Sequence, residues 1–327
     1  MTRSVAIDIE RFEIAGGFKI SRGTRTHAEV IVATLQDGDY IGRGECVPYA
    51  RYGESMESVQ TQIEQIAALL KDGLSRSALQ EAMPAGAARN ALDCALWDLE
   101  AKQTGQSASD IAGLGALSAV TTAFTISVDT PEVMAQKTAV AAHRPLLKVK
   151  LAGPGDDKRI QAVRKAAPDS SLIVDANEAW DESCFEKNMA ACVSAGVALI
   201  EQPLPSANDG LLAEINRPIT ICADESLHTR DGLDELRAKY DAVNIKLDKA
   251  GGLTEAIELT RAAKDLDFKI MVGCMLGTSL AMAPAVLIAQ LADYVDLDGP
   301  LLLTKDRSPG LKFEGSTLFP PLPDLWG

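Results

Sequence analysis

Charged residues recur at nearly even intervals along the second half of this chain, each at the end of a short apolar run. Lys150, Asp175, Glu201, Asp224 and Lys246 are separated by 25, 26, 23 and 22 residues. Such an interval is the length of one strand, one helix and their two loops. It predicts a ring of parallel strands, with each charged residue at the C-terminal end of a strand. In a (β/α)8 barrel, that rim carries the active site.

The chain divides into two patterns near residue 115. Residues 1–115 contain three alternating apolar runs and then helical stretches at about 55–70 and 85–102, which predicts a small α+β capping domain. Residues 116–308 alternate strand and helix, and no glycine-rich phosphate loop is present, so a (β/α)8-type barrel, a modified TIM barrel, is favoured over an open sheet. The tail, 309–327, is expected to complete the capping domain. The barrel strands are expected to begin near Ala123, Leu146, Leu172, Val197, Ile219, Ala242, Lys269 and Tyr294.

Composition excludes several classes of partner. The net charge is −14 and no basic run occurs, which argues against nucleic acid. No apolar stretch is long enough to span a bilayer, and the N-terminus lacks a signal-peptide core, so no membrane association is expected. Six cysteines without a CxxC pattern are typical of buried thiols in a reducing cytoplasm. The sequence predicts a cytoplasmic protein and leaves a homo-oligomer open.

Three carboxylates fall at the ends of consecutive expected strands. Asp175, Glu201 and Asp224 close the third, fourth and fifth strands of the barrel. Neighbouring strands lie ~4.8 Å apart, so three rim positions can converge on one cation. Their hard oxygen donors suit Mg²⁺, with Mn²⁺ as a substitute. Each acid alone would also suit a helix N-cap, but three in register favour a metal site.

Lysines flank this expected site. Lys148 and Lys150 are two apart in one strand and so face the same side, which we expect to be the barrel mouth. Lys246, four strands later, would approach from the opposite side. Burial, a neighbouring ammonium group and a dication would each lower a lysine pKa and so favour a catalytic base. The alternative is that the lysines only balance the carboxylates.

A second acidic pair follows the last expected strand. Asp296 and Asp298 in VDLDGP are two apart and face one side. Two carboxylates without a metal suit a cationic group of a substrate, such as an ammonium. A strand-end turn is the alternative, since Asp–Gly–Pro favours turns.

These residues together resemble those of the muconate-lactonizing subgroup of the enolase superfamily, and within it the dipeptide epimerases. The likeness covers nearly the whole chain. It includes SRGTRT (21–26), GECVPYARYGES (44–55), PAGAARNALDCALWDL (84–99), KVK (148–150), VDANE (174–178), EQPLP (201–205), ICADES (221–226), VNIKLDKAGGLTEA (243–256), GCMLGTS (273–279) and DLD (296–298).

The resemblance implies an isomerase that interconverts L-Ala-L-Glu and L-Ala-D-Glu by 1,1-proton transfer through an enediolate, in murein peptide recycling. A Lys base with Mg²⁺ and an ene-diolate is the general pattern of such sites. The resemblance also implies a dipeptide substrate with a free N-terminal ammonium group and an acidic second residue. Lys150 and Lys246 would be the two bases, and Lys148 would lie near the substrate carboxylate. Asp296 and Asp298 would hold the ammonium, and Thr125 would contact the substrate.

The capping domain would then close over the barrel mouth. Glycines at 16, 17 and 23 permit a mobile segment there. In the SRGTRT context, Arg25 is the residue expected to bind the acidic side chain of the substrate, with Arg22 and Arg51 as alternatives.

Other functions stay open at this point. Within the superfamily they are an N-acylamino acid racemase, o-succinylbenzoate synthase or a cycloisomerase, whose substrates lack a free ammonium. A Schiff-base aldolase using Lys246 or Lys150, or a non-catalytic dipeptide-binding protein, would need no metal-dependent proton transfer.

Overall fold

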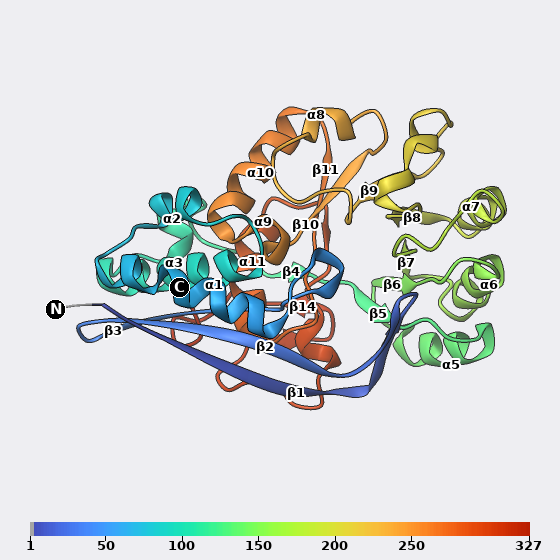
Figure 1. The fold of residues 1–327 in the computed structure, drawn as a ribbon. Coiled ribbons are helices and arrows are strands. Elements are labelled where there is room, and N and C mark those ends of the chain that lie inside the picture. Colours follow the sequence, from blue (N-terminus) through green and yellow to red (C-terminus); the bar gives the residue numbers. More distant parts are fainter. Residues whose placement is uncertain (1–2) are drawn as a thin grey trace.

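Eight parallel strands form a curled sheet in the computed structural model, which describes residues 3–327. Figure 1 shows them beside the long strands of the N-terminal part. The backbone N–H of Ala123, next to the first strand, donates to the carbonyl of Val295 in the last strand (2.8 Å), so the ring closes. The strands are β5 (Phe124–Ile126), β6 (Leu146–Lys150), β7 (Ser171–Asp175), β8 (Val197–Glu201), β9 (Thr220–Ala223), β10 (Ala242–Ile245), β11 (Lys269–Val272) and β12 (Tyr294–Val295).

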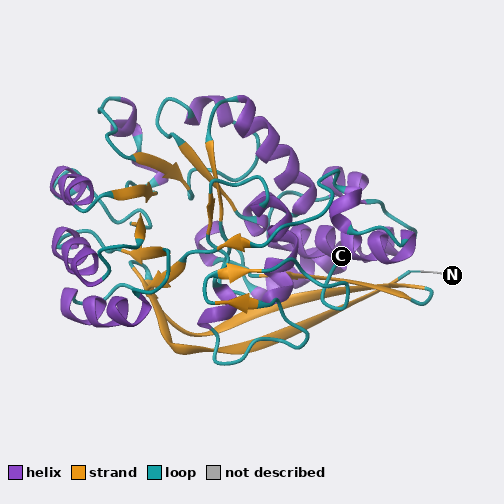
Figure 2. Ribbon diagram, turned by 180° about the vertical axis from the view of Figure 1, so that it is seen from behind, coloured by secondary structure: helices purple, strands orange, loops and turns teal. Residues whose placement is uncertain are grey.

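Helices cover the outside of this ring (Figure 2). Two short 3₁₀ helices, Ser206–Asn208 and Gly210–Ala213, link β8 to β9, and another, Gly299–Leu302, follows β12. These features make the barrel a modified (β/α)8 type, as the sequence predicted. The α-helices of this part are α5 (Pro131–Ala141), α6 (Asp156–Ala166), α7 (Phe185–Ser194), α8 (Leu233–Leu236), α9 (Leu247–Ala250), α10 (Leu253–Asp265) and α11 (Ser279–Ala289).

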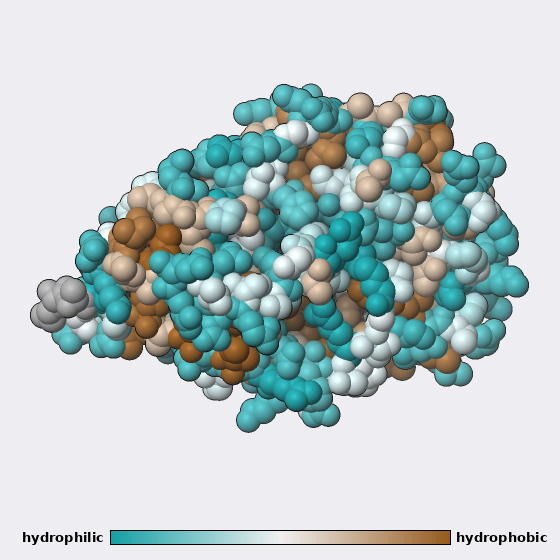
Figure 3. Space-filling view, in the orientation of Figure 1, coloured by the Kyte–Doolittle hydropathy of each residue, from teal (hydrophilic) through white to brown (hydrophobic). Residues whose placement is uncertain are grey.

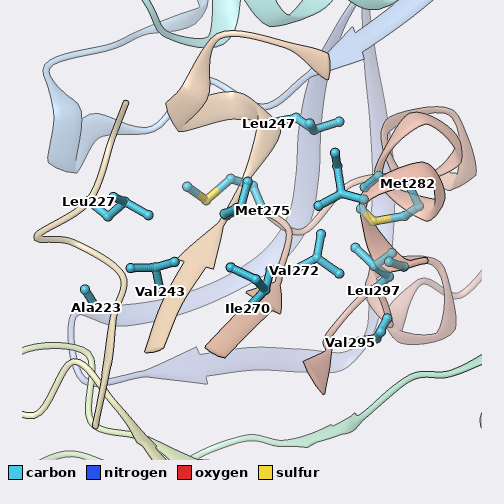
Figure 4. Close-up of a cluster of buried hydrophobic side chains, with 14 of the residues drawn as sticks. Ala223, Leu227, Val243, Leu247, Ile270, Val272, Met275, Met282, Val295 and Leu297 are labelled. Carbon is cyan, nitrogen blue, oxygen red and sulfur yellow. The ribbon is translucent and has the colours of Figure 1, made fainter. Parts of the chain in front are cut away.

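Local sequence explains where these elements lie. Helix α5 begins at Pro131 because the side chain of Thr130 accepts a bond from the N–H of Val133, and proline suits the first helical position. Outward-facing strand residues such as Val243 and Ile270 belong to the same buried apolar cluster as Met282 of α11 (Figure 4). This apolar layer between strands and helices stabilises the barrel from the outside.

The N-terminal part is an antiparallel sheet of β1 (Ser4–Ile20), β2 (Gly23–Asp37) and β3 (Tyr40–Cys46), followed by helices. The helices are α1 (Met56–Lys71), α2 (Arg76–Ala82), α3 (Ala87–Thr104) and α4 (Ala108–Ile111). Helix α3 lies directly against β3: a Cβ on Gly44 would lie 2.1 Å from the carbonyl oxygen of Ala91. Only glycine permits this close approach.

The C-terminal tail contacts both parts of the chain. Strands β13 (Phe313–Glu314) and β14 (Thr317–Leu318) form a small antiparallel sheet with β4 (Val120–Thr121), which leads into the barrel. The final residues pack on α3, where the indole N–H of Trp326 donates to the carbonyl of Cys94 (2.9 Å).

The β1–β2 hairpin extends over the barrel rim. Its pairing shifts register between Glu13 and Phe18, where Gly16 and Gly17 both adopt positive φ. This bulge bends the hairpin, and the carbonyl of Lys19 accepts a bond from the N–H of Val128 beyond β5 (3.1 Å). The tip of the hairpin therefore lies on the rim where the candidate site is expected.

The cysteines agree with the sequence prediction. All six cysteines are free, and five are buried, as the sequence predicted. Among residues 3–327, no helix combines the length and hydropathy needed to cross a bilayer. The face seen in Figure 3 is mainly hydrophilic, with its apolar residues in scattered groups.

Candidate active site

The three predicted ligand carboxylates lie at adjacent strand ends inside the barrel. Asp175 ends β7 and is paired in register with Glu201 at the end of β8, and Asp224 directly follows β9. All three side chains are buried. Consecutive parallel strands thus place at neighbouring strand ends three acids that are far apart in the sequence.

Lys148 lies deeper in the barrel than the sequence predicts. It is only 1% exposed, inside the barrel below the mouth. Its Nζ lies 2.6 Å from Glu201 Oε2, 2.7 Å from Asp296 Oδ2 and 3.2 Å from Asp175 Oδ2. Three carboxylates offset the cost of burying one ammonium, which is why the side chain need not reach the mouth.

Lys150 and Lys246 approach the carboxylates from different sides. Nζ of Lys150 lies 2.6 Å from Asp175 Oδ2, and Nζ of Lys246 lies 2.6 Å from Asp224 Oδ2. Strand β10 is the fourth strand after β6, so the two strands lie on opposite sides of the eight-stranded ring. Both lysines line the same cavity.

The expectation of lowered lysine pKa values is wrong for the polypeptide by itself. Burial lowers the pKa of Lys148, but the carboxylates of Asp296, Glu201 and Asp175 outweigh burial and hold the pKa well above its usual value. The same holds for the pKa of Lys246, which Asp224 and Glu201 raise against the effect of burial. The acids that Lys148 and Lys246 contact outweigh the effects of burial and of neighbouring ammonium groups.

The carboxylates titrate differently from one another. Burial and the charge of Asp175 raise the pKa of Glu201 to about 7. Burial also acts on Asp224, but Lys246 and Lys249 outweigh it and hold its pKa well below the usual value. An acid with a raised pKa next to one with a lowered pKa is typical of a functional site.

Asp175, Glu201 and Asp224 carry the oxygen donors that a divalent cation prefers. The ammonium groups of Lys148 and Lys246 lie between these carboxylates. Within residues 3–327, no three acidic, histidine or cysteine side chains converge closely enough to form a ready cation cage. However, Glu201 Oε2 is buried without a hydrogen bond of acceptable geometry, although Lys148 Nζ is nearby. Three oxygen-donor side chains, one of them with such an orphaned oxygen, fit Mg²⁺ better than a softer metal.

Sequence reasoning missed two residues that support the acids. Asn244 Nδ2 donates to Glu201 Oε1 (2.7 Å), and Lys249 Nζ lies 2.6 Å from Asp224 Oδ1. Asn244 could have been found, because it precedes Lys246 by two residues in a strand and so shares its face. Lys249 belongs to the short helix α9, and no periodic pattern indicates its inward direction.

A cavity of about 230 Å³ adjoins the acids and lysines. Asp296 and Asp298 line it together with Thr125, whose backbone N–H donates to Asp298 Oδ2 (2.7 Å). Burial, and then the charge of Asp296, raises the pKa of Asp298 to about 7. Asp296 Oδ1 is buried and has no hydrogen-bond partner within the described residues. The sequence-predicted acidic pair and Thr125 thus lie beside the lysines, with one oxygen available to a ligand.

The structure separates the three candidate arginines. Arg22 lies 2.8 Å from Glu225, and Arg51 forms two hydrogen bonds with Glu178. Arg25 lines the cavity, stacks on the ring of Tyr49 at 5.0 Å and makes no ion pair with any residue in 3–327. Arg25 is therefore the arginine whose charge is still available to a ligand.

Comparison with known proteins decides the family. A family model described as "Enolase C-terminal domain-like" matches residues 132–307. Another, described as "Mandelate racemase / muconate lactonizing enzyme, N-terminal domain", matches residues 2–113. The chain belongs to the enolase superfamily. The resemblance inferred from the sequence and the predicted barrel fold are both confirmed.

Relatives within the enolase superfamily indicate the type of enzyme. L-Ala-D/L-Glu epimerase of Escherichia coli (strain K12) is 45% identical over 95% of this chain and 98% of its own. N-acetyl-D-glutamate racemase of a Pseudoalteromonas species is 46% identical, over 91% and 95% of the two chains. These relatives are epimerases and racemases, which is the class of isomerase predicted from the sequence.

Solved structures of similar proteins also include dipeptide epimerases. An enolase family member from Agrobacterium tumefaciens with homology to dipeptide epimerases, crystallised with sodium and L-Ala-L-Glu, is 54% identical with a TM-score of 0.98. The match covers 99% of this chain and 100% of that one. A dipeptide epimerase from Enterococcus faecalis, complexed with Mg and L-Leu-L-Tyr, is 27% identical with a TM-score of 0.90 and covers 98% of both chains. Both structures thus hold a dipeptide, and the second also holds Mg²⁺.

Proposed function

We propose that this protein is a Mg²⁺-dependent dipeptide epimerase that interconverts L-Ala-L-Glu and L-Ala-D-Glu by moving the α-proton of the glutamate. The observation that carries the proposal is the cluster of buried acids with Lys150 and Lys246 on opposite sides of one cavity. Two amines facing one carbon from opposite sides can remove a proton from one face and return it to the other. Inversion at that carbon follows.

Asp175, Glu201 and Asp224 would hold Mg²⁺, with Mn²⁺ as a substitute. When bound, the cation supplies positive charge against the negative charge that develops on the substrate carboxylate as the α-proton leaves. Lys246, whose Nζ lies 2.6 Å from Asp224 Oδ2, would be the second proton-transfer group, opposite Lys150. Lys148 is held by Asp296 and Glu201 and stays charged, so it would help to hold the substrate carboxylate.

The remaining residues would select the substrate. Asp296 has one unpartnered oxygen, and Asp298 lies beside Thr125, so the pair suits the N-terminal ammonium group of a dipeptide. Arg25, free of ion pairs within the described residues, would bind the acidic side chain of the second residue. Turnover of such dipeptides would serve murein peptide recycling in the cytoplasm.

A second candidate is racemisation of an N-acylamino acid. The relative named N-acetyl-D-glutamate racemase, at 46% identity, favours it. The acidic pair argues against it, because an N-acyl substrate has no ammonium group for Asp296 and Asp298. The substrates of other reactions in the superfamily, such as o-succinylbenzoate synthesis, also have no ammonium group for Asp296 and Asp298.

Incubation with L-Ala-L-Glu in D₂O with Mg²⁺ tests the proposal. Proton NMR should show deuterium at the glutamate α-carbon together with the L-Ala-D-Glu diastereomer, and a chelator should stop both. Exchange without inversion, or no exchange with Mg²⁺ present, would contradict the proposal. Inactivation by borohydride together with a carbonyl substrate would instead indicate a Schiff-base aldolase.

A further inference from the structure

Two segments of the capping domain are joined to the barrel rim by arginine–carboxylate pairs that the proposed reaction does not use. One is the tip of the β1–β2 hairpin, which carries Arg22. The other is the loop between β3 and α1, which carries Arg51. Both arginines reach Glu178, three residues after Asp175.

Glu178 is surrounded by donors from three segments. Nε of Arg51 donates to Oε2 (2.9 Å), and Nη2 donates to Oε1 (2.8 Å). Nη1 of Arg22 lies 3.4 Å from Oε2, and the backbone N–H of Ser206 donates to Oε1 (2.9 Å). The Glu178 side chain is 10% exposed, so these pairs are partly shielded from water and stronger than surface pairs. Without this carboxylate, the two guanidinium groups would repel each other.

Arg22 extends the connection to a second strand end. Its Nη2 lies 2.8 Å from Glu225 Oε1, and Glu225 directly follows Asp224. Its Nη1 also donates to the carbonyl of Asn177 (3.1 Å), as does the hydroxyl of Ser21 (3.2 Å). The hairpin is thus tied to the turns that follow both β7 and β9.

The turn that carries Glu178 is shared with a predicted cation ligand. Asn177 and Glu178 both adopt positive φ, +46° and +66°, which is uncommon outside glycine and costs energy. The N–H of Asn177 donates to Asp175 Oδ1 (2.9 Å), and the N–H of Glu178 donates to the carbonyl of Gln202 (2.9 Å). The position of Glu178 is therefore fixed relative to the buried acids.

Arg22 also forms part of one wall of the cavity. The capping domain contributes Phe18, Thr24, Arg25, Tyr49 and Tyr52 to its lining. The hydroxyl of Tyr49 accepts a bond from Arg22 (3.2 Å), and Arg25 stacks on the Tyr49 ring. Displacing Arg22 would therefore move Tyr49 and Arg25.

We propose that Glu178 is a positioning residue that, through Arg51 and Arg22, holds both capping segments over the barrel mouth and so assembles this wall of the substrate cavity. Glu178 contacts neither the lysines nor the acidic pair. The kinetic consequence of this proposal rests on the proposed epimerase function, but its structural consequence does not.

Hydrogen–deuterium exchange of the hairpin, residues 18–26, tests the structural consequence without substrate. In Glu178→Gln, the exchange rate should rise on the order of tenfold, because hydrogen bonds to a charged acceptor are lost. Glu182→Gln is the matched control, since Glu182 lies exposed on the same loop and makes no ion pair within residues 3–327. Its hairpin should exchange at the wild-type rate. Equal rates in Glu178→Gln and wild type would overturn the proposal.

Arg51→Gln tests the same pair without altering the strained turn, since the Arg51 side chain is 39% exposed and folding should tolerate the change. The KM for L-Ala-L-Glu should rise in both variants while kcat changes less, because the cavity wall binds substrate and the lysines are untouched. In Arg51→Gln the segment to follow is the loop that carries this arginine, residues 47–55. Faster exchange of that loop supports the proposal even if Glu178→Gln fails to fold, and an unchanged rate contradicts it. If wild type does not epimerise L-Ala-L-Glu, the proposed function fails, and the exchange rates still decide the role of Glu178.

Discussion

The interior of the barrel has two layers with the same burial and opposite chemistry. The lower layer is apolar, with Ile173 on β7 and Leu199 on β8. The upper layer, two residues further along the same strands, is Asp175 and Glu201. Burying hydrocarbon stabilises the fold, whereas burying charge costs free energy unless each charge is paired. We infer that the lower layer holds the barrel together and the upper layer serves chemistry.

Removing a lysine from the upper layer should have the largest effect on activity. Lys246→Ala should lower kcat by on the order of 10³-fold or more, because one of the two proton-transfer groups is lost. The fold should survive, since Asp224 keeps its contact with Lys249. Polarimetry gives the rate, and calorimetric titration with Mg²⁺ should still show binding.

Lys269→Ala is the matched control for that prediction. Lys269 begins β11 at the opposite end of the barrel and is exposed, so its loss should leave kcat unchanged. Activity of Lys246→Ala close to wild type would show that the upper layer only balances charge.

Shortening a side chain in the lower layer should reduce stability and leave activity unchanged. Leu199→Ala should lower the free energy of unfolding by about 2–5 kcal/mol, because a fully buried side chain leaves a cavity. The folded fraction should keep its kcat. Urea unfolding and activity of the same samples check both, with Val193→Ala, at a half-exposed position, as the control. A stable but inactive Leu199→Ala would remove the distinction between the layers.

Neutralising one acid of the pair should affect binding more than turnover. Asp296→Asn should raise the KM for L-Ala-L-Glu by roughly 10–100-fold, because a buried acceptor for the ammonium group loses its charge. The change in KM for N-acetyl-L-glutamate should be smaller, since that compound has no ammonium. Initial rates over a range of concentrations measure both values. An equal change for both compounds would contradict an ammonium site.

A change of pH should alter the KM for L-Ala-L-Glu, and this is the smallest of the expected effects. The pKa of Asp298 is raised to about 7 by burial and by Asp296, so this side chain is neutral at lower pH and charged at higher pH. Only the charged form attracts an ammonium group. The KM for L-Ala-L-Glu should therefore fall as the pH rises through about 7. In Asp298→Asn that inflection should disappear; its persistence would assign it to another group.

The layers were predictable from the sequence to different degrees. The period of the charged residues and the two-residue repeat within strands located Lys150, Asp175 and Lys246 correctly, because both follow from backbone geometry. The depth of Lys148 and the direction of its pKa shift were not predictable, since they depend on how many acids from other strands surround it. Lys249 was missed because its direction is set by the packing of a four-residue helix.

The contacts of the capping domain were the least predictable. The sequence indicated a lid and favoured Arg25 as the residue that binds the acidic side chain of the substrate. It gave no sign that Arg51 pairs with Glu178, 127 residues away. Such pairs join separate elements and leave no periodic trace, so only the tertiary structure shows which arginine is already engaged.

Competition between two substrates tests the central claim most directly. We propose that the buried acids and lysines epimerise a dipeptide whose ammonium group is held by Asp296 and Asp298. With Mg²⁺ present, kcat/KM for L-Ala-L-Glu should exceed that for N-acetyl-L-glutamate by on the order of 100-fold, the scale of a lost charged contact in a buried site. Equal values, or faster racemisation of N-acetyl-L-glutamate, would contradict the account and identify the acylated amino acid as the substrate.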